Sequence, residues 1–121
     1  MTAISSSPYN AQYGAGKSYI KKLTEAVAAE CESTNVDVEV ITLGTTITPS
    51  LLSNLPGGPA GEAVMKAAMT PEACVEEAFD NLGKSLSVIA GDHNKANVHN
   101  WQANKTDDEY IRYMGSFYSN N

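Results

Sequence analysis

Tyr13 and Lys17 are the two side chains whose types and spacing most directly suggest chemistry. Residues four apart on a helix lie on one face, with their side chains within reach of each other. A free tyrosine phenol has a pKa of about 10, and an ammonium group about 4–6 Å away favours the phenolate and lowers that pKa. A phenol tuned in this way can exchange a proton with an alcohol oxygen. The pair is therefore a candidate general acid/base, although the same spacing also arises by chance on exposed helices.

The same lysine belongs to a second candidate, the run GAGKS at residues 14–18, which imitates the end of a phosphate-binding loop. That motif requires an earlier glycine, at what is position 11 here, and it follows a buried strand. This chain has Ala11, and residues 5–8 are Ser-Ser-Ser-Pro. The sequence therefore disfavours a phosphate-binding loop.

Neither the histidines nor the cysteines form a recognisable metal site. His93 and His99 lie in an asparagine-rich stretch, without a third ligand at a metal-binding spacing. Cys31 and Cys74 stand far apart, and neither belongs to a CxxC pair. We expect solvated loop histidines, two free thiols and no bound metal.

The elements that must position the tyrosine–lysine pair begin with a helix predicted over residues 11–32. Ile20, Leu23 and Val27 recur there at helical spacing. In residues 36–41, valines alternate with carboxylates before an apolar pair, which predicts a strand with one face covered. A helix and a strand joined by a short turn form an α/β unit.

The middle of the chain alternates between loops and helices. Residues 43–49 are predicted as the exit loop of the strand, and residues 50–61, which contain Pro-Gly-Gly-Pro, as a segment that cannot be regular throughout. A short helix is predicted over 62–69, and residues 70–72 (Thr-Pro-Glu) form a strong helix start. Val75, Phe79 and Leu82 form the apolar stripe of the helix that begins there, and Gly83 is its predicted stop.

The last third of the chain is predicted to contain one strand and one helix. Residues 86–90 are short and rich in strand-forming residues, whereas residues 91–105, with four asparagines, are predicted as mostly loop. Residues 106–109 (Thr-Asp-Asp-Glu) form a capping box that opens a final helix. One side of that helix carries Tyr110, Met114, Phe117 and Tyr118.

Composition bounds the possible partners. With 121 residues the chain is long enough for one domain and too short for two. Its net charge of −6 argues against binding to nucleic acid or to an anionic membrane surface. No apolar run approaches the roughly 20 residues of a spanning helix, and the N-terminal residues lack the basic and apolar parts of a signal peptide. We therefore expect a cytoplasmic protein.

Several segments, taken in order, resemble the short-chain dehydrogenases/reductases. Residues 9–30 (YNAQYGAGKSYIKKLTEAVAAE) resemble the active-site helix of that family with its YxxxK motif. Residues 43–48 (LGTTIT) match the glycine and the threonine of the family's Pro-Gly-x-x-x-Thr loop, but not its proline. Residues 69–79 and 86–91 resemble the helix and the strand that close the family's sheet. The resemblance covers roughly residues 5–95.

The resemblance implies an α/β fold that is the C-terminal half of a Rossmann-type doubly wound parallel sheet, lacking the N-terminal dinucleotide-binding half. Residues 1–121 would then form a single partial domain. Residues 1–95 would be the family-like half, and residues 96–121 a C-terminal extension with a helix.

The resemblance also implies roles for individual residues. Tyr13 would be the general acid/base for hydride exchange between NAD(P) and an alcohol or carbonyl compound. Lys17 would hold the nicotinamide ribose and lower the pKa of the phenol. Gly44, Thr46 and Thr48, in the loop after the strand, would contact the nicotinamide carboxamide.

Two parts of the family pattern are absent from this sequence. It contains no glycine-rich turn to seat a pyrophosphate on a helix N-terminus. Ser5, Ser6 and Ser7 stand too close to Tyr13 for the family's catalytic serine. We therefore expect a chain that is poorly active in isolation and holds only part of the NAD(P) site.

The expected partners follow from the same absences. We expect a homo-oligomer or a complementing N-terminal half, and a small apolar alcohol or carbonyl compound as substrate. Two alternatives remain open. One is a non-catalytic truncated relative that acts as a self-associating interaction module, and the other is an unrelated small α/β ligand-binding domain that matches YxxxK by accident.

Overall fold

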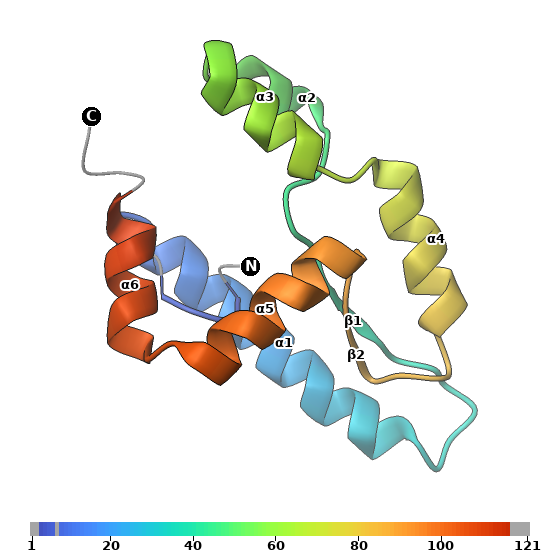
Figure 1. The fold of residues 1–121 in the computed structure, drawn as a ribbon. Coiled ribbons are helices and arrows are strands. Elements are labelled where there is room, and N and C mark those ends of the chain that lie inside the picture. The colour runs from blue at the N-terminus through green and yellow to red at the C-terminus, as the bar shows by residue number, and fades with distance from the viewer. Residues whose placement is uncertain (1–2, 7, 117–121) are drawn as a thin grey trace.

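The structure is a computed structural model that describes residues 3–6 and 8–116. These residues form six helices and two short strands (Figure 1). In chain order the elements are α1 (Ala11–Cys31), β1 (Val40–Thr42), α2 (Pro49–Ser53), α3 (Gly58–Ala67), α4 (Pro71–Asn81), β2 (Ser87–Ile89), α5 (Asp92–Asn104) and α6 (Asp107–Ser116). The chain is thus a mixed α/β structure, as the sequence predicted.

The two strands are parallel, and Val40, Ile41 and Thr42 lie opposite Ser87, Val88 and Ile89. A parallel pair needs a long crossover, and α2, α3 and α4 supply it. Both strands therefore end at the same edge, and the segments that follow them leave side by side. The strand predicted over 36–41 is thus confirmed only at its end, because β2 offers pairing partners to Val40–Thr42 alone.

Helix α1 packs beside β1, and the core between the elements is small. Among the described residues, the buried apolar side chains are Ala28, Cys74, Val88, Ala90 and Val98. Large apolar side chains lie outside it instead, and Phe79 on α4 and Tyr19 on α1 are 72% and 67% exposed. The predicted apolar stripe of α4 is therefore present but uncovered in this chain.

The beginning of α4 confirms the prediction made from its capping residues. The Thr70 hydroxyl accepts a hydrogen bond from the Ala73 amide at 3.2 Å, and Pro71 is the first helical residue. Beyond the helix, Gly83 has a φ of +76°, the left-handed conformation that glycine adopts at little cost after a helix.

The capping box of α6 is also confirmed. The Thr106 amide donates to Glu109 Oε2 at 2.8 Å, and the Glu109 amide donates to Thr106 Oγ1 at 3.3 Å. Among the predicted apolar positions of this helix, Tyr110 and Met114 belong to α6. Phe117 and Tyr118 lie outside the described residues.

The loop predicted over residues 91–105 is wrong, because this stretch forms α5. Asparagine has a low intrinsic helix propensity, but here side chains and tertiary contacts compensate. Asn97 Nδ2 lies 3.0 Å from His93 Nε2, and Asn104 Nδ2 donates to the Asn100 carbonyl at 3.0 Å. Val98, one of the buried apolar residues, anchors the helix to the core.

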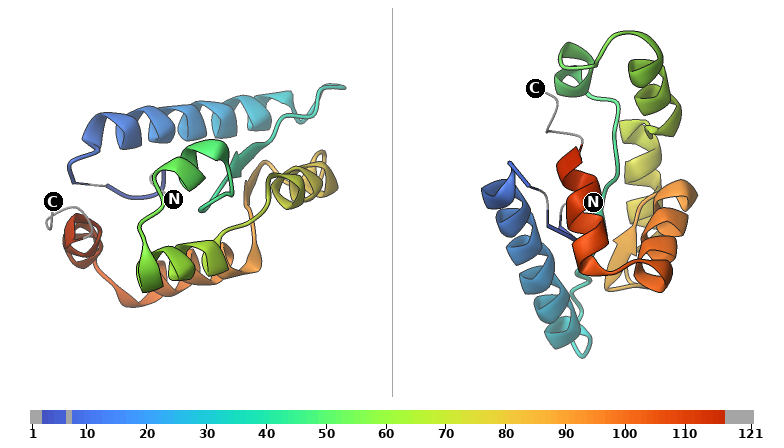
Figure 2. Two further views of the ribbon diagram at one scale, coloured as in Figure 1. Left: turned by 90° about the horizontal axis from the view of Figure 1, so that it is seen from above. Right: turned by 60° about the vertical axis from the view of Figure 1, so that its left-hand side comes forward.

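The segment between β1 and α4 is also more helical than predicted. Residues 49–53 form α2, whose first turn is capped by Thr48, and α3 begins at Gly58 rather than at position 62. The Pro-Gly-Gly-Pro run supplies the break between them. Both helices lie at the end of the molecule away from α1 (Figures 1 and 2). No helix of the described residues is both long and apolar enough to cross a membrane.

Candidate functional site

A cavity of about 390 Å³ lies between α1, β1 and the loop that follows β1, and we call it the α1–β1 pocket. All five predicted site residues line it, namely Tyr13, Lys17, Gly44, Thr46 and Thr48. Two come from α1 and three from the loop after β1, so the packing of α1 beside the strand brings the two groups together.

Tyr13 and Lys17 meet as their spacing predicted. The Lys17 ammonium lies over the face of the Tyr13 ring, 5.4 Å from its centroid, which is a cation–π arrangement. The Tyr13 side chain is 52% exposed. Among the described residues Lys17 makes no ion pair with a carboxylate. Its charge is therefore available to a ligand in the pocket.

Helix α1 is attached to the sheet by a network centred on Glu25. Lys21 donates to the Glu25 carboxylate and, at 3.2 Å, to Ser87 Oγ, while Ser87 Oγ lies 3.0 Å from Glu25 Oε1. Lys22 Nζ lies 3.0 Å from the other carboxylate oxygen. The hydrogen bonds from Lys21 and then Lys22 lower the pKa of Glu25 to about 2. This network links α1 to the first residue of β2.

Lys21 itself lines the α1–β1 pocket, one helical turn after Lys17. Sequence analysis did not identify it. The spacing of Lys21 and Glu25 four residues apart was visible, but Ser87, which completes the network, is distant in the sequence. The network fixes the part of α1 that lies next to the tyrosine–lysine pair.

The loop after β1 is held at its centre by residue 69. The Ile47 amide donates to the Met69 carbonyl at 2.8 Å, and the Met69 amide donates to the Thr45 carbonyl at 2.9 Å. Thr46 Oγ1 lies 3.7 Å from Cys74 Sγ. Thr48 Oγ1 accepts from the Leu51 amide at 3.2 Å, which caps α2. Hydrogen bonds therefore hold the loop in place along its length.

A second acidic group holds the junction between β2 and α5. Glu77, on α4, accepts a hydrogen bond from the Gly91 amide at 2.7 Å and forms an ion pair with Lys95. The hydrogen bond from Lys95 is the main cause that lowers the pKa of Glu77, and the same contact raises the pKa of Lys95. Glu77 therefore fixes where α5 begins.

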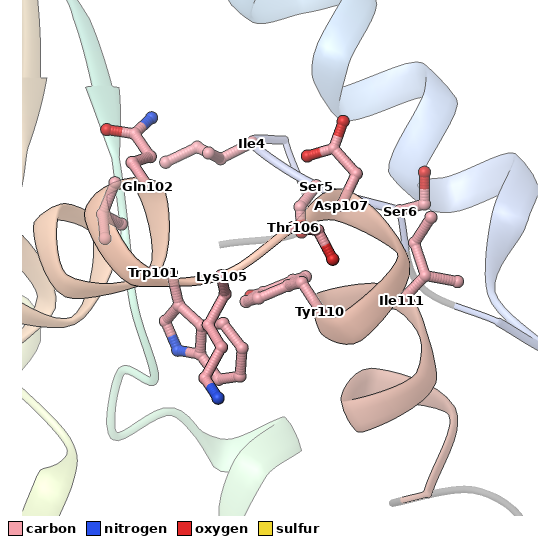
Figure 3. A pocket seen from close by; sticks show the side chains of 11 residues that line it. Ile4, Ser5, Ser6, Trp101, Gln102, Lys105, Thr106, Asp107, Tyr110 and Ile111 are labelled. Atoms are coloured by element: carbon pink, nitrogen blue, oxygen red, sulfur yellow. The ribbon is translucent and has the colours of Figure 1, made fainter.

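A second cavity, of about 340 Å³, lies between residues 4–6 and the helices α5 and α6 (Figure 3). We call it the α5–α6 pocket. The Trp101 and Tyr110 rings line it and contact each other edge to face, with centroids 4.6 Å apart. Tyr113 stacks on the same tryptophan at 4.9 Å. The two pockets adjoin through the N-terminal segment, because Ala3 lines the first and Ile4 the second.

The remaining candidates are not assembled into a site. Within residues 3–6 and 8–116, no three histidine, cysteine or acidic side chains come together as metal ligands. Cys31 and Cys74 are free thiols, as the sequence indicated. His93 lies on α5 rather than in a loop, so the interpretation of the histidines as loop residues is wrong.

Comparison with known proteins supports the resemblance found in the sequence. No protein-family profile matches the chain. It is 77% identical over 118 residues to a 7β-hydroxysteroid dehydrogenase of Collinsella aerofaciens, which covers 98% of this chain and 45% of that protein. A 7β-hydroxysteroid dehydrogenase of Mediterraneibacter gnavus is 75% identical with the same coverage. The corresponding enzyme of Clostridium sardiniense is 42% identical over 95 residues, which is 78% of this chain and 35% of that protein.

A solved structure from a study of 7β-hydroxysteroid dehydrogenase stereoselectivity matches with a TM-score of 0.90 and 76% identity, over 94% of this chain and 44% of that one. The chain belongs to the short-chain dehydrogenase/reductase family. It spans less than half the length of the curated relatives it matches. The family resemblance predicted from the YxxxK helix and the segments after it is therefore confirmed, and the two-stranded parallel sheet corresponds to part of the short-chain dehydrogenase/reductase fold.

Proposed function

We propose that this chain carries the proton-transfer part of an NAD(P)-dependent oxidoreductase that interconverts an alcohol and a carbonyl group on an apolar, hydroxysteroid-like substrate. One observation carries the proposal: the α1–β1 pocket gathers Tyr13, Lys17 and the loop residues Gly44, Thr46 and Thr48 in a chain 77% identical to a 7β-hydroxysteroid dehydrogenase. The relative's name supplies the substrate class, which for this chain is part of the proposal.

In the proposed reaction, Tyr13 is the general acid/base at the alcohol or carbonyl oxygen. Lys17 binds the nicotinamide ribose and favours the phenolate through its charge. A nicotinamide cofactor held there would provide the hydride for carbonyl reduction and take it up in alcohol oxidation. The residues fit such a group: the pocket holds an ammonium without a carboxylate partner among the described residues, two threonines, and a glycine that leaves backbone accessible. Gly44, Thr46 and Thr48 would then bind the carboxamide.

The pyrophosphate end of the cofactor has no comparable seat in this sequence. We infer that a complementing N-terminal half provides it and closes a doubly wound sheet against β1. Within the described residues β1 pairs only with β2, which leaves its other edge open. Directly before that strand, the buried Glu39 Oε2 lacks a hydrogen-bond partner in the described structure, and burial raises the pKa of Glu39. A strand added at this edge would pair with the open side of β1 and would bring hydrogen-bond donors near Glu39. Residues 1–95 would then be the family-like part and 96–121 an extension.

A second candidate function is a non-catalytic module that associates with copies of itself. The observation that favours it is the exposure of large apolar side chains on α4, where Phe79 and Val75 are 72% and 53% exposed. Contiguous apolar surface of this kind is typical of protein contacts. This reading predicts an oligomer without affinity for a nicotinamide cofactor.

The test is a titration of the chain with NADPH and then NADH, followed through Trp101, the only tryptophan in the sequence. Bound reduced nicotinamide accepts energy from an indole, so saturable quenching reports binding, while light scattering gives the mass. Lys17→Met should weaken binding at least tenfold, since about 1.4 kcal/mol of lost contact gives that factor. Lys84→Met, at an exposed position outside both the α1–β1 pocket and the Glu25 network, is the matched control.

Turnover is measured with the chain combined with the remaining part of the Collinsella aerofaciens relative. We expect Tyr13→Phe to keep cofactor binding and to lose activity by about 10²–10⁴-fold, the usual contribution of general acid–base catalysis. Tyr19→Phe, also exposed on α1, should change neither. Absence of cofactor binding in both the isolated and the combined chain would refute the enzymatic proposal and favour the self-associating module.

A further inference from the structure

Asn94 is a polar side chain buried inside the molecule, at the first turn of α5 and only 6% exposed. Its Nδ2 donates a hydrogen bond to the Ala90 carbonyl at 2.7 Å and lies 3.7 Å from Met69 Sδ. Burying a carboxamide is costly unless it is hydrogen-bonded. The Ala90 bond satisfies this group locally, so its position is well defined.

The carboxamide of Asn94 lies directly against Gly44. A Cβ atom placed on Gly44 would stand 2.5 Å from Asn94 Cγ and closer still to its terminal atoms, whereas real Cβ atoms do not approach within 3.0 Å. Gly44 is therefore required by the close approach of α5. The backbone of the loop approaches the terminal atoms of the amide at this point.

The contact between Gly44 and Asn94 separates two cavities. Gly44 lines the α1–β1 pocket, while Asn94 lines a cavity of about 530 Å³ on the other side, together with Met69 and Gly91. Asn94 is thus part of the wall behind the loop. Because both strands end at the same sheet edge, the start of α5 and the loop after β1 lie next to each other (Figure 1).

Met69, which lies in the chain just before α4, contacts both Asn94 and the loop. Its backbone exchanges two hydrogen bonds with Thr45 and Ile47, and its sulfur meets Asn94. Gly91, with φ +82°, passes so close that a Cβ there would stand 2.5 Å from the Met69 sulfur. The loop is therefore supported by Met69 at its centre and by Asn94 at its beginning.

We propose that Asn94 is a positioning residue for the loop Gly44–Thr48, and that it sets how far the backbone of this loop projects into the α1–β1 pocket. The inference rests on the proposed function for what the loop binds. The structural part of the inference does not depend on the proposed function. The Asn94 amide supports Gly44, and a shift of Gly44 would move Thr46 and Thr48 in the same loop. A larger loop displacement would follow from loss of the amide than from loss of an equally buried apolar side chain elsewhere on α5.

The experiment is a double-mutant cycle on the 121-residue chain with Asn94→Ala, Gly44→Ala and both changes together, read by amide hydrogen exchange. Exchange resolves local opening from global unfolding. The reporting amides are Ile47 and Met69 in the loop contact, with Val88 in β2 as the reference. We expect each single variant to speed exchange of the loop amides by about tenfold or more while Val88 changes less.

The double variant decides the question. Removing the amide makes room for the added Cβ, so the combined variant should exchange at the loop more slowly than the sum of the single effects requires. Val98→Ala, an equally buried position on α5, is the control and should affect all amides together. Uniform changes at all amides, or strictly additive effects at the loop, would overturn the proposal.

The cofactor titration is run on the same variants. If the wild-type chain binds NADPH, Asn94→Ala should raise the dissociation constant for NADPH severalfold. Asn94→Gln should raise it too, because the longer side chain places its amide differently against Gly44. If the wild-type chain does not bind NADPH, the proposed function fails while the exchange result still decides whether Asn94 positions the loop.

Discussion

Replacing Glu25 by Gln tests whether the network between α1 and β2 stabilises the fold. The pKa of Glu25 falls from 4.5 to about 2 because Lys21, Lys22 and Ser87 hydrogen-bond its carboxylate. A shift of that size corresponds to about 3 kcal/mol at ~1.4 kcal/mol for each pKa unit. The Glu25 side chain is 24% exposed, so solvent screens part of the interaction. We therefore expect Glu25→Gln to cost about 1–2 kcal/mol of unfolding free energy at pH 7.

The stabilisation by Glu25 should depend on pH. Because the folded-state pKa lies below the unfolded value, the stabilisation is fully present above about pH 4.5 and is lost as pH falls toward 2. Urea unfolding at a series of pH values should show the wild-type and Glu25→Gln curves converging across this window. Glu30→Gln, on the same helix and without an ion pair in the described part of the chain, is the control. A wild-type advantage that stays constant from pH 7 to pH 2 would refute the reasoning.

Two further predictions concern the C-terminal helices. Glu77→Gln should cost about 1 kcal/mol of unfolding free energy at neutral pH, because it weakens the charged hydrogen bond to the Gly91 amide. The pKa of Glu77 is lowered in the folded state, so the difference from wild type should shrink as the pH falls below about 4.5. Thermal unfolding measures both effects. Thr106→Ala should destabilise α6 by about 1 kcal/mol through loss of its cap and should shift the emission of Trp101, whose ring contacts Tyr110 on that helix. Thr106→Ser keeps the cap and should leave the emission unchanged.

The features predicted correctly from the sequence are those encoded locally. Thr70 and Pro71 define the start of α4 through their own hydrogen bond and ring, and Thr106 and Glu109 define the start of α6. The spacing of Tyr13 and Lys17 places them on one face of α1 wherever that helix packs. Each of these inferences needs only residues within one or two helical turns.

The features that the sequence did not reveal depend on distant partners. Helix α5 was predicted as loop because its asparagines favour turns, and its start is fixed by Glu77 from α4. Lys21 and Glu25 look like an ordinary surface pair until Ser87 joins them. Asn94 carries no signal at all, because its importance arises from the close approach of Gly44. Tertiary contacts of this kind override local propensity.

These contacts explain why the tyrosine–lysine pair and the loop can be held in place by this chain alone. Helix α1 is fixed to β2 through Glu25 and Ser87, and the loop after β1 is fixed by Met69 and Asn94. The parallel register places the loop after β1 beside the start of α5, while Ser87 stands at the opposite end of β2. The pyrophosphate seat would have to come from elsewhere. If the proposed function holds, we expect the isolated chain to be weakly active although Tyr13 and Lys17 lie together. Poor positioning of the hydride donor can account for about 7–11 kcal/mol of a barrier.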